Sequence, residues 1–157
     1  MVLMPPWPPA RGSDPVVLFV DDEPEILFAL RRCFRHEPVV VFTAGGATEA
    51  LDRLEKTAVD LVVADECMPG MGGTDFLRVA RERSPRTTRA ILTGHPSPAI
   101  VRSGLEAGAD ALLYKPWDDQ SLRETVRRML QKKAAGGRRD AAGERPGRDS
   151  YDLGGEG

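Results

Sequence analysis

The residues that could do chemistry in this chain stand where short apolar runs end. They are Asp21, Asp22, Asp65, Thr93 and Lys115. If the runs are parallel strands of one sheet, their carboxyl ends meet at one edge and bring these groups into one crevice. Three carboxylates gathered there raise one another's pKa unless a cation neutralises them. The residue types therefore predict a hard divalent cation. Mg²⁺ is the best candidate, because it needs few protein ligands and keeps waters and phosphate oxygens.

Such a cation changes what a neighbouring carboxylate can do. A carboxylate beside it can act as a nucleophile and form an aspartyl phosphate. The transferred group carries three charged oxygens, which Mg²⁺, a lysine and a hydroxyl would stabilise. The set is therefore typical of an aspartate that accepts a phosphoryl group.

The elements that must position these groups alternate along the chain. The apolar runs are nearly continuous, as in strands buried on both faces, and they are residues 16–20, 39–42, 61–64, 90–93 and 111–114. The stretches between them carry one apolar stripe each, which suits helices over about 26–34, 47–54, 76–80, 98–107 and 122–130. Helix starts are predicted at Asp22-Glu23-Pro24, Thr74-Asp75 and Asp118-Asp119. The alternation predicts an α/β domain with a doubly wound, five-stranded parallel sheet.

Composition narrows the class of protein. Apolar residues make up 41% of the 157 residues, and the formal net charge of −2 argues against a generally basic nucleic-acid binder. No run approaches the roughly 20 apolar residues that span a bilayer, and two distant cysteines suit a reducing cytoplasm. We expect one domain over residues 15–133. The proline-rich residues 1–14 and the glycine-rich, charged residues 134–157 are expected to be flexible.

Four motifs together resemble a known family. They are Val20-Asp21-Asp22-Glu23, Asp65-x-x-Met68-Pro69-x-x-x-Gly73, Leu92-Thr93-Gly94 and Lys115-Pro116. In this order and spacing they are similar to the receiver domain of bacterial two-component response regulators. The resemblance covers about residues 15–133 and implies a (βα)5 fold with the flavodoxin-like strand order 2-1-3-4-5.

The resemblance implies a metal site and a phosphoacceptor. Asp65 matches the phosphoacceptor, which also binds the metal. Asp22 matches the carboxylate that binds Mg²⁺ directly, and Asp21 matches the neighbour that acts through water. Cys67 matches the position whose backbone carbonyl completes the metal site.

The remaining motifs are implied to act on the phosphoryl group. Thr93 matches the hydroxyl that moves to bind this group, and Lys115 matches the lysine that pairs with its oxygens. The family's peptide bond before the proline at Pro116 is usually cis. His95 lies two residues after Thr93, where it and Cys67 are expected to flank the phosphoryl group and control access of the hydrolytic water. A solvent-exposed loop histidine is the alternative.

One position departs from the family pattern. The family often has Tyr or Phe three residues before the lysine, and Leu112 stands there in this chain. Tyr114 shares the strand face of Leu112 by alternation but lies nearer the site. The usual coupling between the threonine and an aromatic ring is therefore in question, although phosphate acceptance could survive while the output changes.

These observations predict a response regulator without an output domain. A histidine kinase or phosphotransfer protein would phosphorylate Asp65 with Mg²⁺. The face made by the last two helices and the last strand would then bind a downstream protein or a second copy of the chain, with no direct contact to nucleic acid or membrane. No enzymatic activity is expected beyond its own phosphorylation and dephosphorylation.

Two alternatives stay open. One is an interaction module that works without phosphorylation. The other is a Mg²⁺-dependent phosphatase with an aspartate nucleophile, which is less consistent with the sequence because such enzymes place a second aspartate where Cys67 stands.

Overall fold

Five strands alternate with five helices along the chain. A computed structural model describes residues 14–141, and the side chains of residues 14–136. The strands are β1 (Val16–Val20), β2 (Val40–Ala44), β3 (Leu61–Asp65), β4 (Thr88–Thr93) and β5 (Ala111–Tyr114). The helices are α1 (Pro24–Cys33), α2 (Ala47–Lys56), α3 (Gly73–Arg83), α4 (Pro98–Glu106) and α5 (Asp119–Ala141). The predictions made for residues 1–13 and 142–157 lie outside the described residues.

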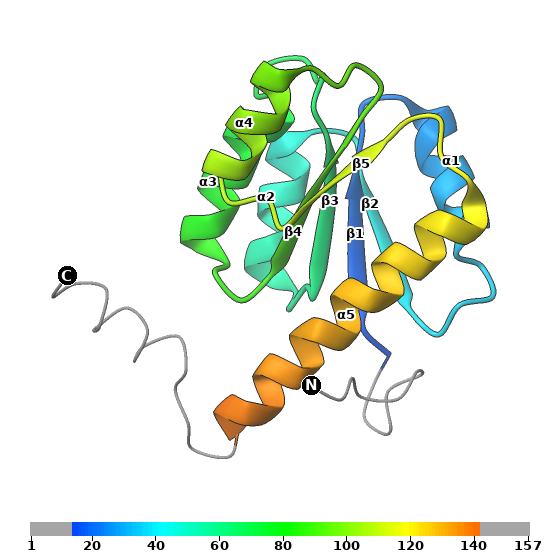
Figure 1. Ribbon diagram of the computed structural model, residues 1–157, viewed down its shortest axis with the longest axis vertical. Helices are drawn as coiled ribbons and strands as arrows, with labels where there is room; N and C mark the ends of the chain where they lie inside the picture. The colour runs from blue at the N-terminus through cyan, green and yellow to red at the C-terminus, as the bar shows by residue number, and fades with distance from the viewer. Residues whose placement is uncertain (1–13, 142–157) are drawn as a thin grey trace, which may run out of the picture.

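The five strands form one parallel sheet in the order β2-β1-β3-β4-β5. This confirms the predicted doubly wound, flavodoxin-like topology. The helices form a layer on each side, with α1 and α5 covering one face and α2, α3 and α4 the other (Figure 1). The chain reverses its direction of winding between β1 and β3, and the crevice at the carboxyl ends of these two strands is where such sheets bind ligands.

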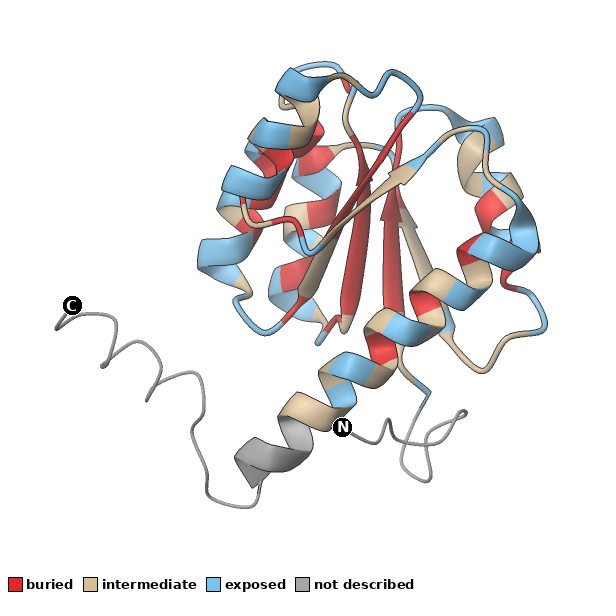
Figure 2. Ribbon diagram, viewed as in Figure 1, coloured by how far each residue is buried: buried red, intermediate tan, exposed pale blue. Residues whose placement is uncertain are grey.

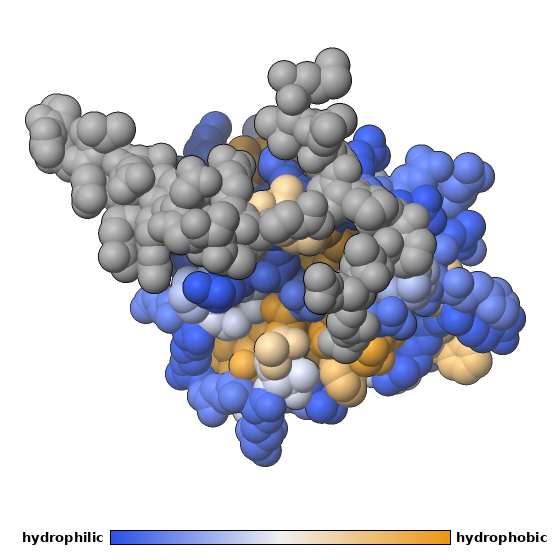
Figure 3. Space-filling view, turned by 90° about the horizontal axis from the view of Figure 1, so that it is seen from below, coloured by the Kyte–Doolittle hydropathy of each residue, from blue (hydrophilic) through white to orange (hydrophobic). Residues whose placement is uncertain are grey.

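The sheet is buried on both faces, which explains the continuous apolar runs. Successive side chains of a strand point to opposite faces, so Leu18 and Val20 belong to the core under α2 and α3. Val17 and Phe19 belong to the core under α1 and α5. The central strands are buried along most of their length (Figure 2). The end of the domain where the strands begin shows a hydrophobic centre bordered by hydrophilic residues (Figure 3).

Several element boundaries differ from the predicted ones by a few residues, as for β2 (Val40–Ala44, predicted 39–42) and β4 (Thr88–Thr93, predicted 90–93), and two of the differences have a visible cause. Helix α3 begins at Gly73 rather than at Thr74-Asp75, because Glu66 from the preceding loop supplies the cap: its Oε1 accepts hydrogen bonds from Thr74 N at 3.1 Å and from Thr74 Oγ1 at 2.6 Å. Helix α5 continues past residue 133, where the sequence analysis ended the domain, to Ala141. The residues just past that boundary include Ala134 and Ala135, which favour a helix.

No helix in the described part of the chain combines the length and the apolar character needed to cross a membrane.

Candidate functional site

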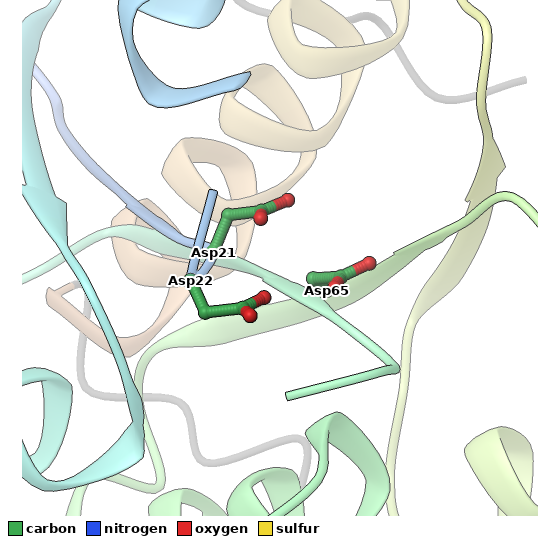
Figure 4. A group of neighbouring side chains, drawn as sticks. All are labelled: Asp21, Asp22 and Asp65. Carbon is green, nitrogen blue, oxygen red and sulfur yellow. The ribbon is translucent and has the colours of Figure 1, made fainter. Parts of the chain in front are cut away.

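Three carboxylates meet at the carboxyl ends of β1 and β3. Asp21 and Asp22 directly follow β1, and Asp65 is the last residue of β3. One oxygen of each lies within 4.8 Å of the others, and the three side chains face the same space (Figure 4). Asp21 and Asp65 are buried, with 1% and 6% of their surface exposed, whereas Asp22 is exposed. The sheet thus assembles the predicted acidic cluster with one member open to solvent.

Lys115, which directly follows β5, reaches across the sheet to this cluster. Its Nζ donates to Asp21 Oδ2 at 2.8 Å and to Asp65 Oδ1 at 3.0 Å. Its side chain is only 16% exposed. Burial lowers the pKa of the Lys115 ammonium, but the hydrogen bonds to the two aspartates outweigh this and leave the pKa raised. Lys115 therefore stays charged and links the two buried carboxylates.

Asp21 is fixed on both of its oxygens. Oδ2 holds Lys115, and Oδ1 accepts a hydrogen bond from the backbone N–H of Glu23 at 2.9 Å. Its own backbone N–H donates to Ala44 O at 3.1 Å, which ties the end of β1 to the end of β2. The orientation of this carboxylate is thus set by the fold, before any ligand arrives.

The electrostatic environment of Asp65 disfavours its charge. Burial raises its pKa, the hydrogen bond from Lys115 opposes this, and the nearby charges of Asp21 and Asp22 raise it further. The net shift is upward from the ordinary value of 3.8. Because desolvation and like charges both act on this carboxyl, a cation placed beside it would be strongly favoured.

The donor set fits a small divalent cation. Three carboxylates against one ammonium leave an excess of two negative charges. In an octahedral Mg²⁺ site, ligand oxygens lie about 2.1 Å from the ion, so two ligands are about 3 to 4.2 Å apart. The oxygens of Asp21, Asp22 and Asp65 lie within 4.8 Å of one another, which is close enough for one ion to bind them directly or through a water. The exposed position of Asp22 leaves room for waters and for the oxygens of a phosphoryl group.

The backbone that carries Asp65 is held by the start of α3. The N–H of Gly73 donates to Glu66 O at 3.0 Å. A Cβ atom at Gly73 would collide with the carbonyl oxygen of Asp65. Together with the bonds that Thr74 donates to Glu66 Oε1, these contacts hold α3 against the loop that follows β3. Glu66 thus caps the first turn of α3.

Thr93 and His95 lie together beside this crevice. Thr93 ends β4 and is 1% exposed. Its Oγ1 accepts a hydrogen bond from the backbone N–H of His95 at 3.1 Å, so its own hydroxyl proton remains available for donation. The residue His95 is exposed. The loop that follows β4 is therefore attached to the hydroxyl predicted to move.

The other sequence-predicted positions are distributed around the crevice. Cys67 is exposed, two residues beyond Asp65. Leu112 packs beneath α4, since a Cβ at Gly104 would lie 3.4 Å from Leu112 Cδ2. Tyr114 pairs in register with Thr93 on the neighbouring strand and is 48% exposed. The position at which the family often has an aromatic residue is thus a packing contact with α4, and the aromatic ring nearest Thr93 in register comes from Tyr114.

A family model for the response regulator receiver domain matches residues 17–127. The chain is 36% identical over 116 residues to the hydrogenase transcriptional regulatory protein HoxA of Cupriavidus necator. The matched region is 73% of this chain and 24% of that protein. The chain is also 31% identical over 145 residues to the transcriptional regulatory protein TrcR of Mycobacterium tuberculosis. This matched region is 92% of this chain and 54% of that protein. The chain therefore spans about half or less of the length of these relatives.

Solved structures resemble this one over most of the chain. The signal receiver domain of an HD domain-containing protein from Pseudomonas fluorescens has a TM-score of 0.75 at 33% identity and covers 78% of this chain and 98% of that one. A CheY-like receiver domain protein from Methanospirillum hungatei has the same TM-score at 30% identity, with 78% and 98% covered. With the family match over residues 17–127, these likenesses show that the chain belongs to the response regulator receiver domain family of two-component signalling systems.

Proposed function

We propose that this receiver domain accepts a phosphoryl group on Asp65 and passes the signal to a protein partner. One observation carries the proposal: three carboxylates from two strand ends converge within 4.8 Å, and Lys115 binds two of them. A structural salt bridge would need one acid for one lysine. The surplus of acids is what a phosphoacceptor with a metal requires, because the ion neutralises the cluster and leaves one carboxylate oxygen to react.

The proposed step transfers a phosphoryl group from a phosphohistidine. A carboxylate oxygen of Asp65 attacks the phosphorus, an O–P bond forms, and the N–P bond breaks. The bonding electrons go to the imidazole nitrogen of the donor. This nitrogen takes up a proton, and the donor is left with a neutral histidine. The donor would be a sensor histidine kinase or a phosphotransfer protein, the partners with which the family works.

Each residue of the crevice has a part in this step. Asp21, Asp22, Asp65 and the backbone carbonyl of Cys67 would hold Mg²⁺, which supplies charge neutralisation for the equatorial phosphoryl oxygens. Lys115 Nζ lies 3.0 Å from the Asp65 carboxylate and would move to a phosphoryl oxygen as the charge transfers.

Thr93 would transmit the new charge to the surface. Its hydroxyl donates to a phosphoryl oxygen, which pulls on the loop that His95 N–H attaches to it. Helix α4 follows this loop, and the face of α4, β5 and α5 carries two of the exposed large hydrophobic residues, Leu105 and Tyr114. This face would bind a downstream protein or a second copy of the chain in the cytoplasm, without direct contact to nucleic acid or membrane.

Cys67 and His95 are proposed to control how long the phosphoryl group lasts. Both residues are exposed and belong to the loops that follow β3 and β4. From there they would flank the water that hydrolyses the acyl phosphate. Exchanging both residues should change the dephosphorylation rate, and an unchanged rate would remove this role.

The direct test is phosphorylation by a small acyl phosphate. The protein is incubated with acetyl phosphate and Mg²⁺, and its intact mass is recorded. A single phosphoryl adduct is expected, lost in Asp65→Asn and in the presence of EDTA. Asp75→Asn is the matched control, because Asp75 is an exposed aspartate of α3, away from the crevice, and it pairs with Arg78 at 2.8 Å. It should be phosphorylated as the parent is.

Two outcomes would replace this proposal. A folded protein that gains no adduct would be an interaction module that works without phosphorylation. Repeated release of phosphate from a phosphomonoester, many times per protein molecule, would instead indicate a phosphatase with Asp65 as its nucleophile.

A further inference from the structure

A cavity of about 580 Å³ lies between α1 and the start of β2, away from the crevice. Its lining combines an apolar wall with basic and aromatic side chains: Phe28, Arg31, Arg32, Phe34, Arg35, Val39 and Val41. Phe28 is 63% exposed, the highest value among the exposed large hydrophobic residues of the described chain. Cavities of about 300–1,000 Å³ with an apolar wall and a few polar groups are typical of small-molecule sites.

The three arginines of this cavity have no acidic partner among the residues that the structure describes. Across the part of the chain that the structure describes, Arg78, Arg83 and Arg127 pair with acids, whereas most of the arginines form no ion pair. Within the same described part, none of Arg31, Arg32 and Arg35 forms an ion pair.

The contacts that these arginines do make are with uncharged groups. Arg31 Nη2 donates to Thr43 Oγ1 at 3.1 Å, and the Arg32 guanidinium lies 5.7 Å from the centre of the Phe28 ring. Both contacts leave most of the guanidinium donors free for another acceptor.

The helix dipole explains only part of this arrangement. Basic side chains are favourable in the last turn of a helix, where Arg31 and Arg32 lie. However, Arg35 lies in the turn after this helix, which ends at Cys33, and it brings a third positive charge to the same cavity. The dipole also does not account for the exposed Phe28 beside them. A ligand that supplies negative charge and a flat apolar surface would satisfy both features.

We propose that this cavity binds a nucleotide, with the phosphates on the arginines and the base on Phe28. Guanidinium groups match phosphate oxygens with paired hydrogen bonds, and a phenyl face stacks on any base. The cavity has the size of one small molecule, which favours a nucleotide over an acidic peptide. The proposal does not depend on phosphorylation of Asp65, because no residue of the crevice lines the cavity.

The test is calorimetric titration of the full chain with ATP, with tripolyphosphate and adenosine as its separate halves. The buffer contains EDTA, so that nucleotide-bound Mg²⁺ does not enter the crevice. ATP should bind more tightly than either half. Arg32→Ala and Arg35→Ala should each weaken ATP binding by about tenfold, the size of one lost charged hydrogen-bonding group. Phe28→Ala should weaken ATP binding but leave tripolyphosphate unchanged.

Two controls separate this cavity from the rest of the surface. Arg86→Ala removes an exposed arginine outside the cavity and should leave ATP binding unchanged. Asp65→Asn should also leave it unchanged, and amide shifts in NMR spectra should change along α1 and β2 but not around Lys115. Circular dichroism confirms that each variant is folded.

Three results would overturn the proposal. If tripolyphosphate binds as tightly as ATP, the surface binds anions and makes no favourable contact with the base. A glutamate-rich peptide that binds more tightly than ATP would show a protein interface. No heat and no amide shifts at millimolar ATP would show that nucleotides do not bind.

Discussion

Two charged regions of this domain are built in opposite ways. The crevice joins Asp21, Asp65 and Lys115 from three strand ends. Lys115 is 94 residues from Asp21 and 50 residues from Asp65 in sequence, and its ammonium donates hydrogen bonds to both carboxylates. The cavity takes its charges from Arg31, Arg32 and Arg35 near the end of one helix, and none of these forms an ion pair within the described chain. The crevice residues therefore stabilise the fold as well as forming a site. The arginines form a site but contribute no ion pair to the stability of the described fold.

This difference matters for how each region tolerates change. A buried charge that loses its partner cannot recover its hydration, so removing the lysine of the crevice leaves two buried carboxylates unpaired. An exposed arginine that is lost leaves nothing unpaired behind. Stability measurements thus separate the two regions even before any ligand is known.

The largest expected effect is that of Lys115→Ala. Lys115 is 16% exposed and bonds two buried carboxylates, so its removal leaves them unpaired. We expect the free energy of unfolding to fall by about 3 kcal/mol. Arg35→Ala should change it by less than about 0.5 kcal/mol. Urea denaturation in EDTA, followed by circular dichroism, measures both.

Lys115→Met distinguishes loss of charge from loss of packing. It keeps most of the length of the side chain but not the ammonium, and it should show most of the same loss. Equal stabilities for the Lys115→Ala and Arg35→Ala variants would contradict the contrast between the two regions.

Gly73→Ala is the next largest prediction and tests the backbone of the crevice. The new Cβ would collide with the carbonyl oxygen of Asp65, and backbone cannot yield as a side-chain tip can. We expect a loss of about 2 kcal/mol from this overpacking. Gly136→Ala is the control, since its Cβ would meet nothing within 4 Å and alanine favours the helix. A thermal melt that places the Gly73→Ala variant at or above the parent would show that α3 can move away from Asp65.

Glu66→Ala should have a smaller effect, about 1 kcal/mol, the usual size of a lost helix cap. It removes the acceptor of two hydrogen bonds from Thr74, at 3.1 Å and 2.6 Å. Glu55→Ala is the matched control, because the Glu55 side chain is 59% exposed and pairs with Arg83 on the surface. If both variants unfold at the same urea concentration, the cap contributes no more than a surface ion pair.

Much of the crevice could be predicted because its residues end strands. The continuous apolar runs located all five strands, and a parallel sheet brings their carboxyl ends to one edge whatever the details of packing. Asp21, Asp65 and Lys115 could therefore be placed together from the sequence. The Glu66–Thr74 contact could not be assigned in the same way, since its partners are eight residues apart across a loop and match no local capping pattern.

The cavity between α1 and β2 could not be predicted for a different reason. Phe28 lies in a helix among other apolar residues, and sequence periodicity does not show that it is 63% exposed. Arginines on the opposite side of an amphipathic helix look like an ordinary solvated face. Only the packing of β2 beside α1, which places three arginines and Phe28 around one cavity, distinguishes these arginines from others.

Asp65→Asn should act in the opposite direction from the other variants and raise stability at neutral pH. Burial first, and then the charges of Asp21 and Asp22, raise the pKa of Asp65 above its ordinary value of 3.8 despite the hydrogen bond from Lys115. A carboxyl with a raised pKa in the folded state contributes stability below the unfolded pKa, and this is lost as the pH rises through the folded value. Asparagine does not titrate and so has no such loss of stability, and its Oδ1 can still accept a hydrogen bond from Lys115 Nζ.

Denaturation in EDTA from pH 3 to pH 8 should show that the free energy of unfolding of the variant rises relative to that of the parent as the pH rises. Added Mg²⁺ should reverse this difference, because it stabilises the parent. A difference that stays constant with pH would mean that Lys115 alone already balances the charge of Asp65 in the folded protein.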